Sequence, residues 1–443
     1  MRTERARRRA GASGVRAVHH RAGGAAGILL VLALTGCVGA DHQTLSVLID
    51  AGPAGLKTWD ALAAAYHEAT GVEIKLETRP SGGEGDNIVK TRLATGDMTD
   101  LFVYNPGSLL RALNPDQSLV DMSGEAWVDT VDPQYRSVVS TPDGMYGLPV
   151  GTTGAGAVIY NKRIYAELGL DVPQTWDEFM ANNAVIDRAG YTPVVQTYGD
   201  PWTAQLWVLG DFYNVAAEDP TWAERYTEGT AKYHDLPARA GFDHLQQIYD
   251  EGYLNATFAS ASATDAVRML ADGEGVHYPT LTGNFAYVLE ESAPEAADSI
   301  GAFAIPGERA DENGLTIWMP NGIYIPRTTS GDTLEAARDF VAWLASSEGC
   351  RVQLANLTVS GPHVIDGCEA DASALPMIDD LETYYDEGRV GLALEFLSPI
   401  KGPSLEQIAV EVGSGIRSAQ SGADLYDQDV VKQAEQLGLE WGS

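Results

Sequence analysis

Cysteine and histidine are scarce in this sequence, with three and eight residues among 443. No cluster of either residue lies near Cys350 or Cys368 at the spacing of metal ligands, so we expect no metal site. Beyond its N-terminal leader the chain also lacks the Gly-x-Ser-x-Gly, His-Glu-x-x-His and Walker patterns. These absences disfavour serine hydrolases, zinc proteases and P-loop enzymes, and nothing in the sequence calls for a cofactor.

Basic residues are few as well, because 29 Lys and Arg stand against 62 Asp and Glu, a formal net charge of −33. Residues 1–36 hold seven of the arginines and one glutamate, which leaves 22 basic and 61 acidic residues and a charge of −39 on the remainder. A surface of this sign repels phosphate backbones and anionic lipid head groups, which argues against nucleic acid as a partner. High-salt or GC-rich lineages give the same acidity, so the charge does not identify a ligand.

Long apolar runs are missing, and the chain has no segment of about 18 apolar residues that would span a bilayer. A short run at 28–34 follows an arginine-rich start, which is the pattern of a secretory signal. The run ends in Leu34-Thr35-Gly36-Cys37, which resembles a bacterial lipobox. We therefore expect a signal peptide at 1–36, a lipidated tether at 37–43 beginning with Cys37, and a protein held at the outer face of the cell membrane. A short membrane anchor or a chance cysteine is the alternative, and the choice between general and twin-arginine export stays open.

Acylation of Cys37 would leave Cys350 and Cys368 as an even pair in an oxidising compartment. A disulfide between them would close a loop of 17 residues, 351–367. Chain-entropy models give such a loop a stabilisation of about 3 kcal/mol. Two free buried thiols are the alternative.

Strand and helix patterns alternate along the chain. Apolar runs at 45–49, 72–76 and 101–104 predict strands, and the apolar stripes between them predict helices ending at Gly71 and Gly96. This order implies parallel strands with right-handed crossovers. A further strand is expected at 157–160, and Thr175 with Glu178 matches a capping box. About 400 residues exceed one hydrophobic core, so we expect two α/β domains.

Residues 146–179 read YGLPVGTTGAGAVIYNKRIYAELGLDVPQTWDEF, and residues 94–102 read ATGDMTDLF. These segments resemble the extracellular solute-binding proteins that serve ABC sugar importers, a family that includes maltose-binding proteins. The four pieces of the longer segment follow the family order, whereas Thr99 replaces the proline usual in the shorter one. The resemblance covers the mature chain, thins between about 205 and 275, and is weak for the ligand.

The resemblance implies a type II periplasmic-binding-protein fold, with two lobes of mainly parallel sheet flanked by helices and a hinge crossed three times. Lobe one is then expected at 44–151 and 320–358, and lobe two at 152–319 and 359–443. The small residues at 151–154 suit a hinge that absorbs backbone rotation. A plain surface turn is the alternative interpretation of that segment.

A sugar cleft needs aromatic plates for C–H faces and planar polar groups for hydroxyls, collected in loops after parallel strands. Trp202 is the strongest single candidate for a stacking plate, and Asp86 is either a hydroxyl acceptor or a helix N-cap. Every aromatic candidate could instead be a core residue. The complete predicted set of ligand contacts is Asp86, Tyr104, Asn105, Thr153, Trp202, Tyr278, Asn284, Trp318 and Asn321.

The sequence therefore predicts a monomeric, non-enzymatic binder that captures a carbohydrate, with an oligosaccharide favoured, and presents it to the transmembrane permease subunits of an ABC importer. Contact with the membrane would be made by the lipid at Cys37 alone. Two other functions remain open. One is a binder of a polyamine, iron chelate or peptide. The other is a surface glycan-degrading enzyme, since 61 acidic residues will supply some suitably spaced carboxylate pair by chance.

Overall fold

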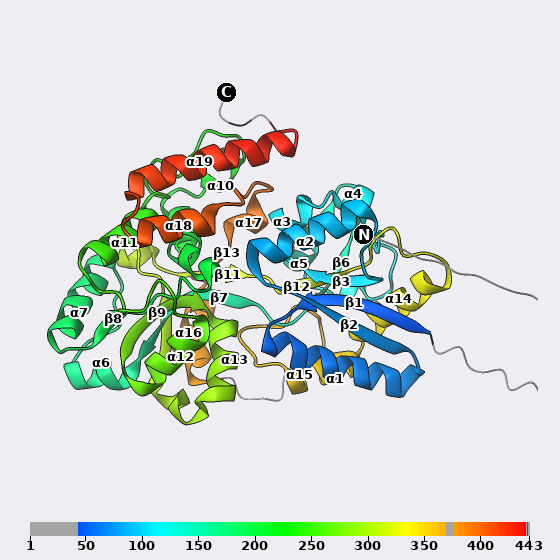
Figure 1. The fold of residues 1–443 in the computed structure, drawn as a ribbon, viewed down its shortest axis with the longest axis horizontal. Coiled ribbons are helices and arrows are strands. Elements are labelled where there is room, and N and C mark those ends of the chain that lie inside the picture. The colour runs from blue at the N-terminus through cyan, green and yellow to red at the C-terminus, as the bar shows by residue number, and fades with distance from the viewer. Residues whose placement is uncertain (1–42, 369–374, 440, 442–443) are drawn as a thin grey trace, which may run out of the picture. The chain divides into compact units, whose positions relative to one another are not determined.

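Two sheets, each flanked by helices, organise the computed structural model, which describes residues 43–368, 375–439 and 441 (Figure 1). The predicted leader and Cys37 lie outside the described residues. The first sheet has the strand order β2-β1-β3-β12-β6. Its strands are β1 (Thr44–Asp50), β2 (Glu73–Arg79), β3 (Leu101–Tyr104), β6 (Gly147–Val150) and β12 (Asn321–Tyr324).

The second sheet has the order β13-β11-β7-β9-β8, and β10 pairs with β7. Its strands are β7 (Gly154–Asn161), β8 (Thr192–Val194), β9 (Gly275–Leu281), β10 (Ile300–Ala304), β11 (Leu315–Trp318) and β13 (Val390–Leu392). A separate small hairpin joins β4 (Ser140–Thr141) to β5 (Gly144–Met145).

The two-lobed α/β fold class is confirmed, but the sheets are mixed and not mainly parallel as expected. Strand β1 is parallel to β2 and β3, whereas β12 is antiparallel to β3 and β6. In the second sheet β7 is antiparallel to β9, β10 and β11. Strands β12 and β7 lie next to the crossings between the sheets. Each runs opposite to its neighbouring strands, and this makes both sheets mixed.

Helices cover both sheets. Those associated with the first sheet are α1 (Pro53–Thr70), α2 (Gly82–Thr95), α3 (Ser108–Arg111), α4 (Pro115–Ser118), α5 (Pro133–Val138), α14 (Gly331–Leu344) and α15 (Ser347–Asn356). Those associated with the second sheet are α6 (Lys162–Leu168), α7 (Trp176–Arg188), α8 (Leu206–Leu209), α9 (Phe212–Glu218), α10 (Trp222–Thr227), α11 (Ala240–Asp250), α12 (Ala263–Asp272), α13 (Thr282–Ser292), α16 (Pro376–Asp386), α17 (Leu394–Leu397), α18 (Leu405–Gly413) and α19 (Ala419–Gln436).

Local sequence explains where several helices begin and end. Helices α1 and α2 stop before Gly71 and Gly96, whose φ values of 79° and 74° are left-handed and suit glycine. Helix α7 begins at a complete capping box, in which Thr175 accepts from the Glu178 amide and the Glu178 side chain accepts from the Thr175 amide. These three sequence predictions are confirmed.

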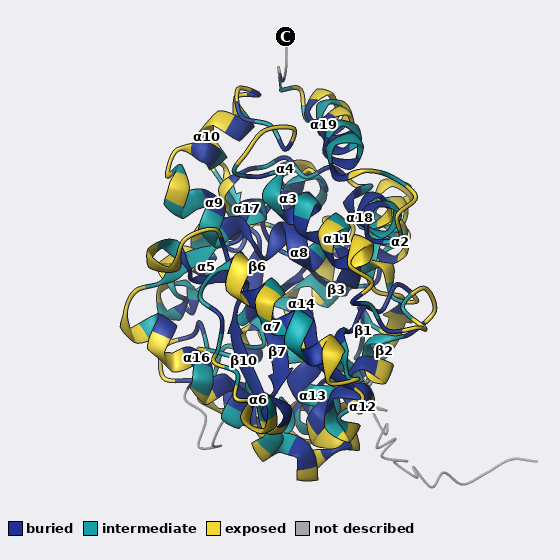
Figure 2. Ribbon diagram, turned by 90° about the vertical axis from the view of Figure 1, so that its left-hand side faces the viewer, coloured by how far each residue is buried: buried dark blue, intermediate teal, exposed yellow. Residues whose placement is uncertain are grey.

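Strand β7 separates two of the hydrophobic cores. Val158 and Tyr160 belong to one buried cluster, whereas Ala157 and Ile159 belong to another. Side chains alternate across a strand, so a strand covered on both faces is apolar at every position. This explains the continuous apolar run seen in the sequence, and the buried residues of β7 and β10 are visible in Figure 2.

The chain passes from the first sheet to the second through residues 151–153, between β6 and β7, and returns through 319–320, between β11 and β12. The limits of the lobes stay a proposal, and the core clusters favour one change to it. Val364, Ile365 and Cys368 pack in the same buried cluster as β1 and β3, whereas Met377 packs with β7. We therefore place the last lobe boundary after Cys368 and not at 358.

Candidate functional site

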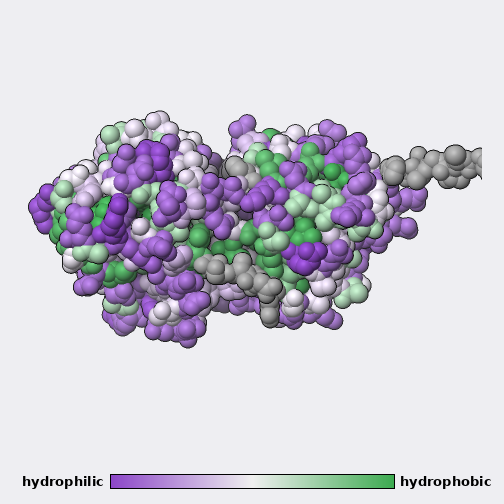
Figure 3. All heavy atoms as spheres, turned by 90° about the horizontal axis from the view of Figure 1, so that it is seen from below, coloured by the Kyte–Doolittle hydropathy of each residue, from purple (hydrophilic) through white to green (hydrophobic). Residues whose placement is uncertain are grey.

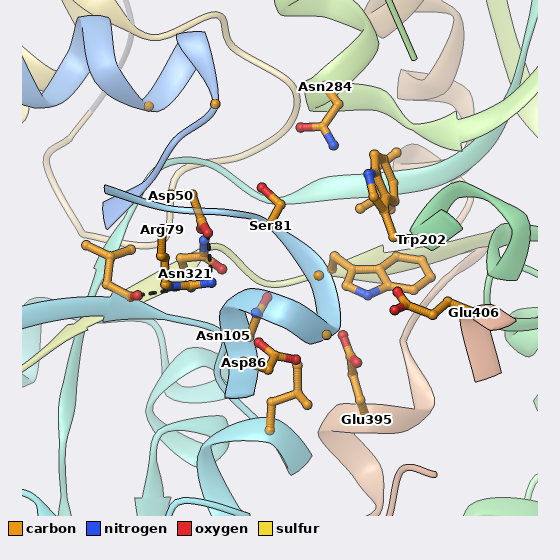
Figure 4. A pocket seen from close by; sticks show the side chains of 18 of the residues that line it. Asp50, Arg79, Ser81, Asp86, Asn105, Trp202, Asn284, Asn321, Glu395 and Glu406 are labelled. Atoms are coloured by element: carbon orange, nitrogen blue, oxygen red, sulfur yellow. Dashed lines mark hydrogen bonds and ion pairs between the residues drawn. The ribbon is translucent and has the colours of Figure 1, made fainter. Parts of the chain in front are cut away.

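A cavity of about 540 Å³ is lined by elements of both sheets. The first sheet contributes the carboxyl ends of β1, β2 and β3 and the start of α2, and the second contributes α13, α17, α18 and the 3-10 helix η2 (Pro201–Gln205). In Figure 4 the labelled residues of the first 110 positions face Trp202, Asn284, Glu395 and Glu406 from other parts of the chain. Segments that lie far apart in the sequence and belong to two different sheets therefore form one site.

Six of the nine predicted contacts line this cavity. They are Asp86, Asn105, Trp202, Asn284, Trp318 and Asn321. The alternative role of Asp86 as a helix N-cap is wrong, because α2 begins at Gly82 after Ser81. Burial raises the pKa of the Asp86 carboxyl, and the nearby charges of Arg79 and Lys401 oppose that rise.

The other three predicted residues do not line the cavity. Tyr278 is 1% exposed, and its hydroxyl lies 2.9 Å from Thr197 Oγ1 within the core. Thr153 Oγ1 donates to the Pro362 carbonyl oxygen at 3.2 Å, so its side chain stabilises the crossing segment. Tyr104 is completely buried, and its hydroxyl interacts electrostatically with the Asp86 carboxylate. It therefore supports a cavity residue without lining the cavity itself. These three residues are therefore not on the surface of the cavity.

Two half-buried tryptophans line the cavity from the second lobe. Trp202 lies in η2, and Trp318 ends β11. Strand β7 makes room for the Trp318 indole with a glycine, because a Cβ built on Gly156 would lie 2.8 Å from Trp318 Cζ3. The sequence predicted Trp318 as a ligand contact, but it did not point to Gly156, the glycine that makes room for its ring. The ring of Trp59 lines the same cavity and was missed.

A buried ion pair at the ends of β1 and β2 was also missed. Arg79 Nη1 lies 2.9 Å from Asp50 Oδ1, and the arginine side chain is 2% exposed. The guanidinium also donates to the Val103 carbonyl oxygen and lies 5.4 Å from the Tyr104 ring centroid. Burial raises the pKa of Asp50, and the Arg79 charge opposes that rise. Both residues end parallel strands, so the strand-end rule could have found them.

A second charged group comes from the C-terminal part of the chain. Lys401 Nζ lies 3.0 Å from Glu395 Oε2, and both side chains are largely buried. The Glu406 carboxylate lies against the start of α2, where a Cβ built on Gly83 would be 3.0 Å from Glu406 Oε1. Burial raises the pKa of Glu406, the Lys401 charge lowers it, and the Asp86 charge raises it further. The Gly83 backbone amide also lowers the pKa of this carboxyl. No sequence pattern pointed to these residues, because about 300 positions separate them from α2.

The crossing segment at 151–153 reaches the cavity wall at Gly151 and is held by residues from the second half of the chain. Gly151, with φ of 113°, donates its N–H to Gln353 Oε1 at 2.7 Å. Thr152 Oγ1 lies 3.1 Å from Ser360 Oγ, and the Thr153 amide donates to the Pro362 carbonyl oxygen at 2.9 Å. Gly151 and Gln353 line the cavity, and Gln353 was not predicted.

The two cysteines beyond the leader lie together, with Cα atoms 5.7 Å apart and their Sγ atoms paired. The sequence shows no cluster of histidine or cysteine around this pair at metal-ligand spacing, but the fold brings one histidine beside it, with His363 Nε2 3.4 Å from Cys368 Sγ. The chain folds at 357–363 so that the His363 ring returns to the cysteine pair. The spacing of five residues between His363 and Cys368 is the sequence feature that could have indicated this contact. While the sulfurs are bonded to each other, His363 remains as the single free ligand atom of this group, so the group does not fit a metal ion.

The described part of the chain contains no helix with the length and apolar character needed to cross a membrane. Hydrophilic residues dominate the face drawn in Figure 3.

Comparison with known proteins identifies a family. Residues 51–349 match the model of the bacterial extracellular solute-binding protein family. The multiple sugar-binding protein of Streptococcus mutans is 25% identical over 282 residues, which are 62% of this chain and 64% of that protein. The melibiose/raffinose/stachyose-binding protein MelE of Bacillus subtilis is 22% identical over 338 residues, 74% of this chain and 75% of the relative. The chain thus spans somewhat less than two thirds of the first of these relatives.

Solved structures share the fold at low sequence identity. A chitin oligosaccharide binding protein superposes with a TM-score of 0.76 at 19% identity and covers 89% of this chain and 100% of its own. The solute-binding protein RafE, solved with raffinose, gives a TM-score of 0.72 at 21% identity over 89% of this chain and 99% of its own. At these identities the likeness concerns the fold.

Proposed function

This chain belongs to the bacterial extracellular solute-binding proteins, and from that premise we propose that it captures an oligosaccharide and presents it to the membrane permease of an ABC importer. The observation that carries the proposal is the cavity of about 540 Å³ between elements of the two lobes, with Trp202 and Trp318 on its wall. A volume in this range accommodates a small-molecule ligand of several rings. No step of covalent chemistry is part of the proposal.

The chemistry of the lining supports a sugar. Indole faces stack on the C–H faces of a pyranose, and the planar amides of Asn105, Asn284 and Asn321 can each donate to and accept from hydroxyls. The relatives from Streptococcus mutans and Bacillus subtilis are named for sugars, which favours the same class here.

Capture would work by closure around the solute. Among the contacts that already join the lobes are the Lys57–Glu291 ion pair at 2.7 Å between α1 and α13, and the approach of the Glu406 carboxylate in α18 to Gly83 in α2. The ion pair is half-exposed and contributes little by itself. A solute that touches both walls binds the closed state more tightly and shifts the population toward it. The permease then distinguishes the loaded from the empty form by shape.

We further propose that Cys37 is acylated and holds a monomeric protein at the outer face of the cell membrane. The lipobox-like sequence before Cys37 supports the anchor, and the extracellular family supports the location. A bond between Cys350 and Cys368 is part of this proposal, since an oxidising compartment permits it and their Cα separation of 5.7 Å suits it. Mass spectrometry of membrane-extracted protein tests both modifications.

A thermal-shift panel followed by titration calorimetry tests the function. The panel contains raffinose, stachyose and chitin oligosaccharides, and binding raises the unfolding temperature according to RT ln(1 + [L]/Kd). We expect saturable binding to one of these classes and recovery of the sugar unchanged. Release of shorter products on incubation would contradict the proposal in favour of a glycan-degrading enzyme.

One relative supports a second candidate ligand class. The protein GgtB of Synechocystis, 23% identical over 356 residues, is named for osmoprotective compounds. The panel therefore also contains small osmolytes, a polyamine, an iron chelate and a peptide. Binding of one of these without any sugar binding would replace the oligosaccharide proposal with a different transport function.

A further inference from the structure

We propose that Gln353 is a solute-contacting residue whose side chain is oriented by His363, and that the Cys350–Cys368 bond keeps His363 in that position. Reduction of this bond then weakens solute binding. The affinity part rests on the proposed function, whereas the coupling between the cysteines and Gln353 can be tested without any solute.

The Gln353 side chain has one defined orientation. Its Oε1 accepts from the Gly151 N–H at 2.7 Å and lies 3.3 Å from His363 Nε2. The Ile365 N–H donates to His363 Nδ1 at 3.2 Å, so the neutral ring carries its proton on Nε2 and donates from there. Burial lowers the pKa of His363 to about 4, which keeps the ring neutral near pH 7. Two donors therefore converge on Oε1.

This orientation leaves the Gln353 amide nitrogen for the cavity. Gln353 lines the cavity although the residue is 2% exposed, and the two donors on Oε1 leave its amide nitrogen for the cavity side. A buried amide donor at the wall of a polar cavity is suited to a solute hydroxyl. The same side chain holds Gly151 in the crossing segment, so one residue contacts both the hinge and the solute.

The cysteine pair is the other end of the same hydrogen-bond chain. His363 Nε2 lies 3.4 Å from Cys368 Sγ as well as 3.3 Å from Gln353 Oε1. The single proton on Nε2 is therefore shared between a strong amide acceptor and a weak sulfur acceptor. Because a bonded sulfur competes poorly, the proton favours Gln353 while the bond is intact.

Reduction changes this competition. An external dithiol supplies two electrons and two protons, the Sγ–Sγ bond breaks, Cys350 and Cys368 become thiols, and the dithiol closes to its own disulfide. Once free of the bond, the Cys368 thiol can turn and can donate as well as accept, so His363 faces a different partner. The loop at 351–367 also loses its covalent closure. Both changes free Gln353 to turn, and the Gly151 amide loses a fixed partner.

Hydrogen exchange of the Gly151 amide reads the coupling without a solute. In a Cys37→Ser background, Cys350 and Cys368 are the two remaining cysteines. We expect reduction with dithiothreitol, in the presence of a chelator, to speed exchange at Gly151 by about three- to tenfold, the range of one lost hydrogen bond. Free-thiol counting by mass spectrometry shows that reduction occurred. A variant with both cysteines replaced by serine should exchange fast and should not respond to the dithiol.

Variants of the two connecting residues separate positioning from solute contact. Gln353→Glu keeps acceptors for Gly151 but removes the amide donor, so Gly151 exchange should stay slow while affinity falls. His363→Ala should speed Gly151 exchange in the oxidised protein, and His363→Gln, which restores a side-chain N–H, should partly reverse the effect. A general loss of structure would not produce this pattern, and far-UV circular dichroism checks it.

Affinity for raffinose and stachyose, measured by calorimetry, is the second readout. We expect reduction to raise Kd at least about fivefold, as typical allosteric couplings do. If neither sugar nor any other panel member binds, the proposed function fails while the exchange experiment still stands. Unchanged Gly151 exchange with both thiols shown to be free would overturn the inference, and so would unchanged affinity of Gln353→Glu for a sugar that binds the parent protein.

Discussion

Replacement of Gly156 by alanine is expected to weaken solute binding indirectly. The new methyl group would displace the ring of Trp318, which lines the cavity. A Cβ at position 156 would lie 2.8 Å from Trp318 Cζ3, 3.4 Å from Trp318 Cη2 and 3.2 Å from the Gly210 Cα. Carbon atoms pack best at about 3.5–4.0 Å, so the indole must move by most of an ångström. The Gly210 backbone cannot give way as easily, so the ring takes the displacement.

The magnitude follows from this overlap. Extra methyl groups in packed regions cost about 1–3 kcal/mol, and we expect the free energy of unfolding of Gly156→Ala to fall within that range. Because Trp318 lines the cavity, the displaced ring also loses its stacking geometry. Affinity for the sugar should fall about tenfold, the equivalent of about 1.4 kcal/mol.

Strand β7 provides a matched control. Gly154 lies two residues earlier on the same side of the strand, and a Cβ there would meet Thr282 Oγ1 at 3.7 Å and Ser360 Oγ at 4.0 Å. These are ordinary contacts, so Gly154→Ala should change unfolding by no more than about 0.5 kcal/mol. Urea unfolding and calorimetry compare the two variants.

A double-mutant cycle locates the cause. Trp318→Ala alone should weaken binding, because it removes the indole ring on which the sugar would stack. In the Trp318→Ala background, Gly156→Ala should lower the free energy of unfolding little further, because the clash with the ring is gone. Equal unfolding and equal affinity of the Gly156→Ala and Gly154→Ala variants would refute the packing argument.

Three further predictions concern other parts of the molecule. Trp202→Ala should raise the Kd for the sugar about tenfold with little change in urea unfolding, and an unchanged Kd would remove Trp202 from the site. Burial raises the pKa of Asp211 to about 6, so the folded protein binds a proton at this carboxyl more tightly than the unfolded chain does. The free energy of unfolding therefore rises as pH falls through 6. Between pH 8 and 5, wild type should gain about 1.4 kcal/mol over Asp211→Asn in thermal or urea unfolding. Arg79→Met leaves Asp50 without its partner and should cost about 3 kcal/mol in unfolding, part of which Asp50→Asn restores in the double variant; full additivity would contradict the ion-pair interpretation.

Part of the candidate site could be predicted from sequence because topology places certain positions together. Asp86, Asn105 and Asn321 follow or begin strands of the first sheet, and strand ends meet at one edge. The same rule would have included Asp50 and Arg79. Tyr278, which the family resemblance suggested, lies in the core instead, because strand β9 is covered on both faces and is buried along nearly its whole length.

The sequence by itself determined the features that depend on neighbouring residues. Glycine after α1 and α2 ended those helices, the Thr175–Glu178 pair began α7, and the segment at 146–179 identified the family together with its two-lobed α/β fold. Each of these signals lies within a few residues of the feature that it specifies.

Tertiary structure alone decided which distant residues share the cavity. Lys401 and Glu406 join Asp86 across about 300 positions, and His363 returns to the cysteine pair next to Gln353. Gly156 makes space for a tryptophan more than 160 positions later. Contacts of this kind depend on how the two lobes pack and on the direction in which each side chain points. A periodic pattern along the chain specifies neither the packing nor the direction.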